Sequence, residues 1–127
     1  MNITSASIKQ VILYVPDMES EVRFYRDVMG FSIRYPAGLT NYGSQMWVEL
    51  EAGGCILALH GGADQPADGQ QELVFEVADL HQARQTLIDA GIAVGAIRTL
   101  EDGRLIASGA DPAGHRFSIR PAGTFES

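Results

Sequence analysis

The stretch VILYVPDMESEVRFYRDVMGF, residues 11–31, decides the fold. It begins with an apolar run rich in β-branched residues, which predicts a strand over Val11–Val15. A proline ends this run, and Asp17 or Ser20 can cap a helix by accepting hydrogen bonds from its first N–H groups. Apolar residues then recur at helical spacing until Gly30, a residue type that commonly ends helices. The stretch therefore predicts a strand followed by a helix.

The second half of the chain shows the same order. In LVFEVADLHQARQTLIDAGI, residues 73–92, an apolar run again predicts a strand. Asp79 can cap the helix that follows, and apolar residues recur at helical spacing until Gly91. The turn sequence EDGR, residues 101–104, predicts a hairpin. Further strands are expected at Phe31–Tyr35, Gln45–Glu51 and Cys55–His60, and at Ala93–Leu100, Leu105–Ala110 and His115–Arg120. Both halves thus read strand, helix and three strands.

Spacings within the two halves also agree. Gln10 lies seven residues before Asp17, and Glu72 lies seven before Asp79. Likewise, Ala58 and Ser118 each follow a glycine by four residues. A constant internal offset of this kind indicates duplication.

We therefore predict an α+β fold, a single domain over residues 1–127 made of two tandem βαβββ modules. The first module covers residues 8–60 and the second covers residues 72–121. Residues 61–71, rich in Gly, Pro and Asp, are expected to link them.

Composition limits the kinds of partner. The chain has 46% hydrophobic and 20% charged residues, as soluble globular proteins do, and its net charge of −7 argues against nucleic acid or anionic membrane as partner.

Cys55 is the one cysteine, so no intrachain disulfide can form and a reducing cytoplasm fits best. The start MNITSASIKQ lacks the basic and apolar regions of a secretory signal, and no apolar run reaches membrane-spanning length. We expect a cytoplasmic protein.

The two quoted stretches, with DPAGHRFSI at residues 111–119, resemble the vicinal oxygen chelate superfamily, which includes glyoxalase I, extradiol dioxygenases, and fosfomycin- and bleomycin-resistance proteins. The resemblance covers residues 8–120. It implies a curved cleft of mixed sheet with helices on the outer face, and frequent homodimers. Metal-dependent members place ligands on the first and last strand of each module, at positions that correspond here to Gln10, Ala58, Glu72 and Ser118. The fold alone does not specify a reaction, because it hosts several chemistries.

The residues at these positions argue against a metal cofactor. Alanine has no donor atom, and a neutral serine hydroxyl is a poor ligand where a carboxylate is expected. Gln10 and Glu72 alone would leave a divalent ion largely hydrated, and Arg116 beside Ser118 would repel it. As an alternative, His60 could join Gln10 and Glu72 around a divalent ion such as Zn, Ni, Mn or Fe.

Strand alternation predicts what the cleft offers instead. Trp47 could add a stacking wall, although a lone tryptophan is more often a core residue. The residues 35–45, YPAGLTNYGSQ, are expected to form a mobile lid. His115 is expected to lie in the turn before the last strand. The expected ligand-binding residues are Gln10, Tyr14, Trp47, His60, Glu72, Glu76, Arg116 and Ser118, and Arg120 is expected on the same face.

The resulting hypothesis is metal-independent binding or sequestration of a small, polar and partly aromatic molecule. One alternative is a metal-dependent isomerase, lyase or dioxygenase acting on vicinal oxygens through Gln10, His60 and Glu72, with Glu72 as a candidate general base. Another is a dimeric scaffold without a ligand, in which glutamates and arginines merely neutralise each other.

Overall fold

The structure, a computed structural model, describes residues 3–67 and 71–122. The chain divides into two compact units, Met1–Gln65 and Pro66–Ser127. The expected linker crosses the boundary between them. Three of its residues, 68–70, lie outside the described residues, as do the first two of the N-terminal stretch.

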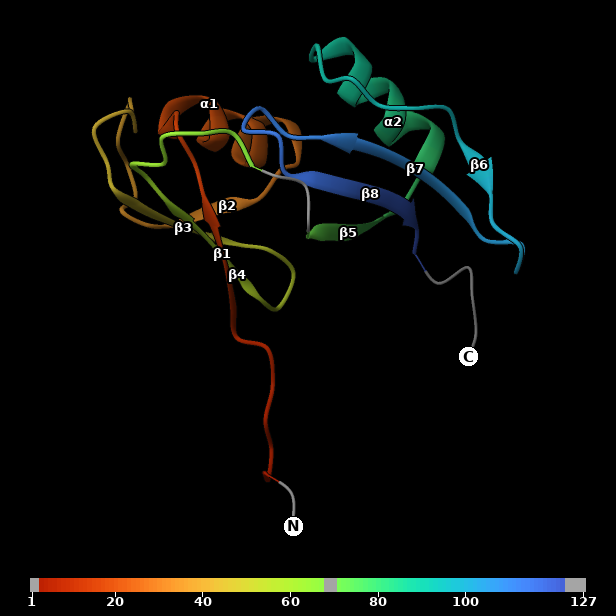
Figure 1. Cartoon of the computed structure of the whole chain (residues 1–127), viewed down its shortest axis with the longest axis horizontal. Coiled ribbons are helices and arrows are strands. Elements are labelled where there is room, and N and C mark those ends of the chain that lie inside the picture. The colour runs from red at the N-terminus through yellow and green to blue at the C-terminus, as the bar shows by residue number, and fades with distance from the viewer. Residues whose placement is uncertain (1–2, 68–70, 123–127) are drawn as a thin grey trace. The chain divides into compact units, whose positions relative to one another are not determined.

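The first unit contains one four-stranded mixed sheet (Figure 1). Its elements are β1 (Gln10–Tyr14), α1 (Met18–Val22), the π-helix η1 (Arg23–Val28), β2 (Ser32–Tyr35), β3 (Trp47–Glu51) and β4 (Ile56–His60). The strand order is β1-β4-β3-β2. β1 and β4 pair in parallel, and the other neighbours are antiparallel.

The second unit repeats this architecture. Its elements are β5 (Glu72–Val77), α2 (Leu80–Asp89), β6 (Arg98–Thr99), β7 (Leu105–Ala110) and β8 (Arg116–Pro121). The strand order is β5-β8-β7-β6, and again the first and last strands pair in parallel. The predicted α+β fold with two βαβββ modules is confirmed.

The helices begin and end where local sequence predicted. Asp17, rather than Ser20, caps α1 by accepting a hydrogen bond from the Ser20 N–H at 3.3 Å, and Asp79 accepts one from the Gln82 N–H at 3.0 Å. Gly30 and Gly91 have φ values of +83° and +81°, which glycine adopts without steric cost. Among the described residues, no helix has the length and apolar character needed to cross a membrane.

The first helix differs from its prediction in hydrogen-bond pattern. After Val22 the α-helix gives way to η1, where the Met29 N–H donates to the Phe24 carbonyl at 2.9 Å. Phe24 and the adjacent Tyr25 are both buried, with ring centroids 4.8 Å apart. Apolar spacing over so few turns does not distinguish this wider turn from an α-helix.

Alternation along the strands gives each sheet one exposed side. On β1, Leu13 is buried, whereas Ile12 and Tyr14 are 42% and 57% exposed. On β5, Glu72, Val74 and Glu76 are exposed and the residues between them are half-buried. We call the side of the first sheet that carries Tyr14 the first open face, and the side of the second sheet that carries Glu72 the second open face.

The strand expected at Ala93–Leu100 is much shorter in the structure. Only Arg98–Thr99 pairs as β6, and Val94 makes an isolated bridge to Gly109. At Gly109 a Cβ atom would lie 2.7 Å from the Ala93 carbonyl oxygen. The chain therefore approaches β7 closely at a glycine, which interrupts the ladder.

The segment expected to be a lid is anchored within the first unit. Tyr42 is 1% exposed, and its hydroxyl donates to the Pro36 carbonyl at 2.8 Å. Its backbone N–H donates to the Glu19 carboxylate at 2.6 Å, and the Arg26 guanidinium lies 5.9 Å from its ring centroid. Within the segment 35–45, Tyr42 therefore packs inward as a core residue.

Candidate functional site

The register of β5 and β8 pairs the predicted acidic and basic residues on the second open face. Glu72 lies opposite Arg116, and Glu76 lies opposite Arg120. The Arg116 and Glu72 side chains form an ion pair at 3.4 Å, and Arg120 Nη2 donates to Glu76 at 2.9 Å. These pairs are partly solvent-exposed, so each contributes little to the free energy of unfolding.

A directed chain of hydrogen bonds ends at Glu72. The Ser118 hydroxyl donates to Glu72 Oε2. Since that hydroxyl has one proton, the 2.7 Å contact between the Ser108 and Ser118 oxygens has Ser108 as the donor. Arg98 Nη1 in turn donates to Ser108 at 3.4 Å. Ser118 is fully buried, so this chain holds the Glu72 carboxylate in one orientation.

Sequence reasoning identified Glu72 and Ser118 but missed Ser108 and Arg98. Ser108 lies opposite Ser118 in the antiparallel pairing of β7 and β8. The EDGR turn and the alternation of β7 could have placed Ser108 on this face. Arg98 was not identifiable in this way, because β6 is shorter than its sequence pattern suggests.

Three predicted residues come together on the first open face. The register places Tyr14 opposite His60 on β4, and Trp47 of β3 opposite the same histidine. The ring centroids of Tyr14 and His60 are 5.0 Å apart, and those of Trp47 and His60 are 6.0 Å apart with nearly perpendicular planes. We call Tyr14, His60 and Trp47 the aromatic row.

Hydrogen bonds orient two members of this row. His60 Nδ1 lies 2.8 Å from the Gly61 carbonyl oxygen, which can only accept, so Nδ1 carries the proton and Nε2 of the neutral ring is an acceptor. Trp47 Nε1 donates to Glu49 at 2.8 Å. Arg34 donates to Glu49 and also to Glu51, and hydrogen bonds to Glu51 and Glu49 raise the pKa of Arg34 above its usual value.

The register separates Gln10 from His60. Gln10 lies opposite Ile56, whereas His60 lies opposite Tyr14, four residues further along the same strand pair. Four residues of strand correspond to roughly 13 Å, far beyond the span of two ligands on one ion. Within the first unit, Gln10 and His60 are therefore not brought together.

The residues at the four positions implied by the resemblance do not fit a divalent metal. Position 58 presents a buried methyl group, and Gln10 offers only a neutral amide. Glu72 already accepts the Ser118 proton on one oxygen and pairs with Arg116 through the other. An ion at Glu72 would have to displace the hydroxyl and approach a guanidinium, and both changes disfavour it.

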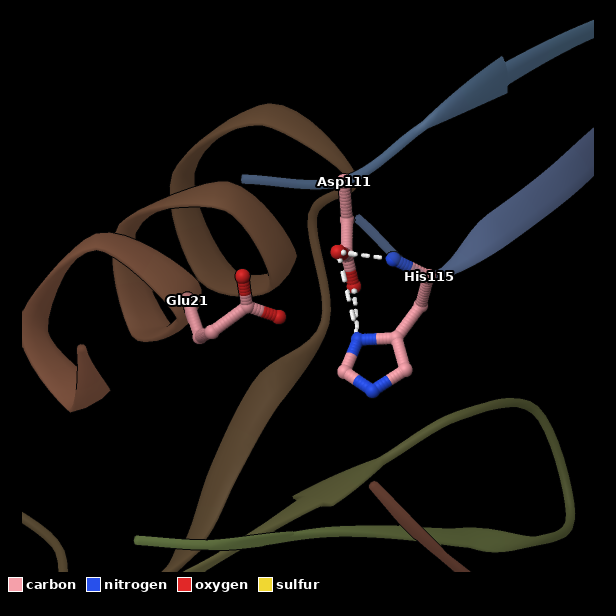
Figure 2. A group of neighbouring side chains, drawn as sticks. All are labelled: Glu21, Asp111 and His115. Atoms are coloured by element: carbon pink, nitrogen blue, oxygen red, sulfur yellow. Dashed lines mark hydrogen bonds and ion pairs between the residues drawn. The ribbon is translucent and has the colours of Figure 1, made fainter. Parts of the chain in front are cut away.

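A further polar pair organises the turn between β7 and β8 (Figure 2). The fully buried Asp111 carboxylate accepts hydrogen bonds from the backbone N–H groups of Ala113 and His115, at 3.0 and 2.9 Å. His115 Nδ1 lies 3.1 Å from the same carboxylate. This geometry agrees with the turn role expected for His115. Sequence reasoning missed Asp111, although its place at the start of DPAGH is typical of an Asx turn.

Comparison with protein-family models identifies one family. The family model of the Glyoxalase/Bleomycin resistance protein/Dioxygenase superfamily matches residues 7–119. No curated protein sequence matches the chain significantly.

Solved structures show a similar fold at low sequence identity. Lactoylglutathione lyase from Agrobacterium tumefaciens is 22% identical with a TM-score of 0.72, covering 97% of this chain and 100% of that chain. A glyoxalase family protein from Enterococcus faecalis is 19% identical with a TM-score of 0.75, covering 93% and 99%. A virulence protein from Salmonella typhimurium is 24% identical with a TM-score of 0.68, covering 94% and 98%.

Proposed function

The chain belongs to the Glyoxalase/Bleomycin resistance protein/Dioxygenase superfamily, and from this premise we propose that it binds a small organic molecule without a metal ion. The observation that carries the proposal is the state of Glu72. It is the one carboxylate among the four positions implied by the resemblance, and Ser118 and Arg116 already engage its two oxygens. A carboxylate satisfied in this way serves as a fixed polar group rather than as a metal ligand.

The aromatic row supports binding of a ligand with a flat ring. Tyr14 is 57% exposed and Ile12, beside it on the same face, is 42% exposed. Aromatic rings pack favourably in offset or edge-to-face arrangements, and exposed apolar groups next to oriented polar atoms are typical of small-molecule sites. His60 Nε2 would accept a hydrogen bond from the ligand, and Tyr14 would contribute a ring face.

Trp47 makes this proposal directly measurable, because it is the single tryptophan of the chain. Titration with small aromatic compounds that do not emit in the tryptophan band, beginning with nicotinamide and quinoline, should change Trp47 fluorescence saturably for at least one of them. The affinity for that compound should fall about tenfold or more in Tyr14→Ala, because a ring contact is lost. It should be the same in EDTA as in added Mn²⁺, Ni²⁺, Zn²⁺ or Fe²⁺.

A matched control is Ile88→Ala, which removes an exposed apolar side chain from α2 of the other unit. Affinity in this variant should equal that of the wild type. A response that requires added metal, or that is lost equally in Tyr14→Ala and Ile88→Ala, would contradict the proposal.

A further inference from the structure

A half-open hollow lies at the β6–β7 hairpin of the second unit, whereas the residues of the aromatic row belong to the first unit. Its volume is about 170 Å³, and its lining combines four apolar side chains with two guanidinium groups. The lining residues are Val74, Leu100, Arg104, Leu105, Ile106 and Arg120. None of these residues belongs to the set that sequence reasoning assigned to ligand binding, although Arg120 was placed on the same face.

Strand register explains why these side chains meet. Ser108 lies opposite Ser118, so Ile106 falls opposite Arg120 on the second open face, next to exposed Val74 on β5. The hairpin then turns Leu100 and Arg104 toward the same end, with the Leu100 N–H bonded to the Arg104 carbonyl at 2.8 Å. The hollow is thus built from fixed strands and a short turn.

The charges around this hollow differ from those of the chain as a whole. The chain carries nine basic and sixteen acidic residues. The second open face and its hairpin nevertheless gather four of the nine basic residues, together with carboxylates that pair with them. The arginines are Arg98, Arg104, Arg116 and Arg120, and the carboxylates are Glu72, Glu76 and Asp102.

Carboxylates position both guanidiniums of the hollow. Arg104 Nε donates to Asp102 at 2.8 Å, and Arg120 Nη2 donates to Glu76 at 2.9 Å. A guanidinium has five N–H donors in a planar fork, so it can bind a second carboxylate beside the first. Their side chains are 33% and 35% exposed, which leaves them within reach of a solute.

We propose that this hollow binds a small carboxylate with an apolar body of about one six-membered ring. A cavity of about 150 Å³ takes one benzene ring, so the volume here matches a body of that size. The apolar walls contact the ring, and Arg104 and Arg120 receive the carboxylate. This proposal goes beyond the aromatic row and does not depend on it.

Benzoate is the probe for this site, with benzamide as its neutral counterpart of similar size. Isothermal titration should show one benzoate bound per chain, at least tenfold more tightly than benzamide, because charge-assisted hydrogen bonds are lost with the amide. Arg104→Gln and Arg120→Gln should each weaken benzoate binding about tenfold. Raising NaCl from 0.05 to 0.5 M should also weaken it.

Arg23→Gln is the matched control, since it removes an arginine from a surface ion pair, with Glu19, outside the hollow. It should leave benzoate affinity unchanged, as should Tyr14→Ala, which separates this site from the aromatic row. Val74→Phe, which fills the hollow from an exposed strand position, should abolish binding while the melting temperature shows that the variant folds. Equal binding of benzoate and benzamide, equal effects of Arg104→Gln and Arg23→Gln, or no benzoate binding at all would overturn the proposal.

Discussion

At the scale of one residue, Ser118 links the Glu72 carboxylate to a hydrogen-bond network of the second unit. Its buried hydroxyl donates to Glu72 and accepts from Ser108, so the oxygen has partners on both sides. Lone pairs of Glu72 and Ser118 that could otherwise face an ion instead accept hydrogen bonds within the second unit. The serine between Arg116 and Arg120 in the sequence is therefore the centre of a network that fixes an acidic side chain.

Replacing Ser118 by alanine should destabilise the protein by about 1–3 kcal/mol, because Glu72 and Ser108 each lose a partner in a partly buried setting. Urea unfolding followed by circular dichroism measures this change. Ser32→Ala, at an exposed position of β2, is the control and should stay within about 0.5 kcal/mol of the wild type. Equal stability of the two variants would show that the network contributes nothing.

The sequence predicts which side of a strand a residue faces more readily than it predicts which residues contact each other across strands. Side chains alternate between the two sides of a strand, and this alternation alone puts Glu72, Val74 and Glu76 on one side without knowledge of the fold. It does not say which residue of a neighbouring strand lies opposite, because register depends on turn geometry and packing. Tyr14, His60 and Trp47 were thus each predicted, but their meeting in one row was not.

The elements differ in how locally they are determined. Both α-helices begin at an aspartate whose side chain accepts a backbone N–H, and this signal lies within four residues of sequence. By contrast, the short β6 depends on packing between residues that are distant in sequence, such as Gly109 against Ala93. Burial of Tyr42 belongs to this second class, because the turn residues around it do not indicate that its ring packs in the core.

Glu19 connects α1 to the segment that contains Tyr42, and this contact makes stability depend on pH. The hydrogen bond from the Tyr42 backbone N–H, helped by Arg23, holds the pKa of Glu19 below its usual value. A carboxyl whose pKa is lowered by folding stabilises the folded state above the pKa of the unfolded chain, near 4.3. That contribution is lost as pH falls through the lower, folded-state pKa.

The free-energy difference between wild type and Glu19→Gln should therefore be constant above about pH 5 and shrink progressively below about pH 4.3. Urea midpoints measured between pH 3 and pH 7 would follow it. Glu101→Gln, in the exposed turn between β6 and β7, serves as the control. A difference for Glu19→Gln that stays flat down to pH 3, or that parallels the Glu101→Gln curve, would contradict this account of the contact.

At the scale of the whole molecule, the duplication seen in the sequence recurs in strand register. Ala58 lies opposite Ile12, two residues after Gln10, and Ser118 lies opposite Val74, two residues after Glu72. Equivalent spacings thus produce equivalent positions in two separate sheets. The internal offsets were enough to predict both modules, because each repeats a whole βαβββ unit.

Family membership does not specify the chemistry, which depends on the side chains of the site. The solved structures reported above are all below 25% identical to this chain, so they show the fold and not the ligand. The account of this chain rests on the methyl group at position 58 and the engaged Glu72–Ser118 pair. The central claim is therefore about metal content.

The most direct test is elemental analysis of protein purified without chelators, together with melting curves in Mn²⁺, Ni²⁺, Zn²⁺ and Fe²⁺. A tightly bound ion would raise the melting temperature by mass action. We predict far less than one equivalent of any divalent metal and no ion-specific rise in melting temperature. One equivalent of metal that is retained in Glu76→Ala but lost in Glu72→Ala would contradict the account.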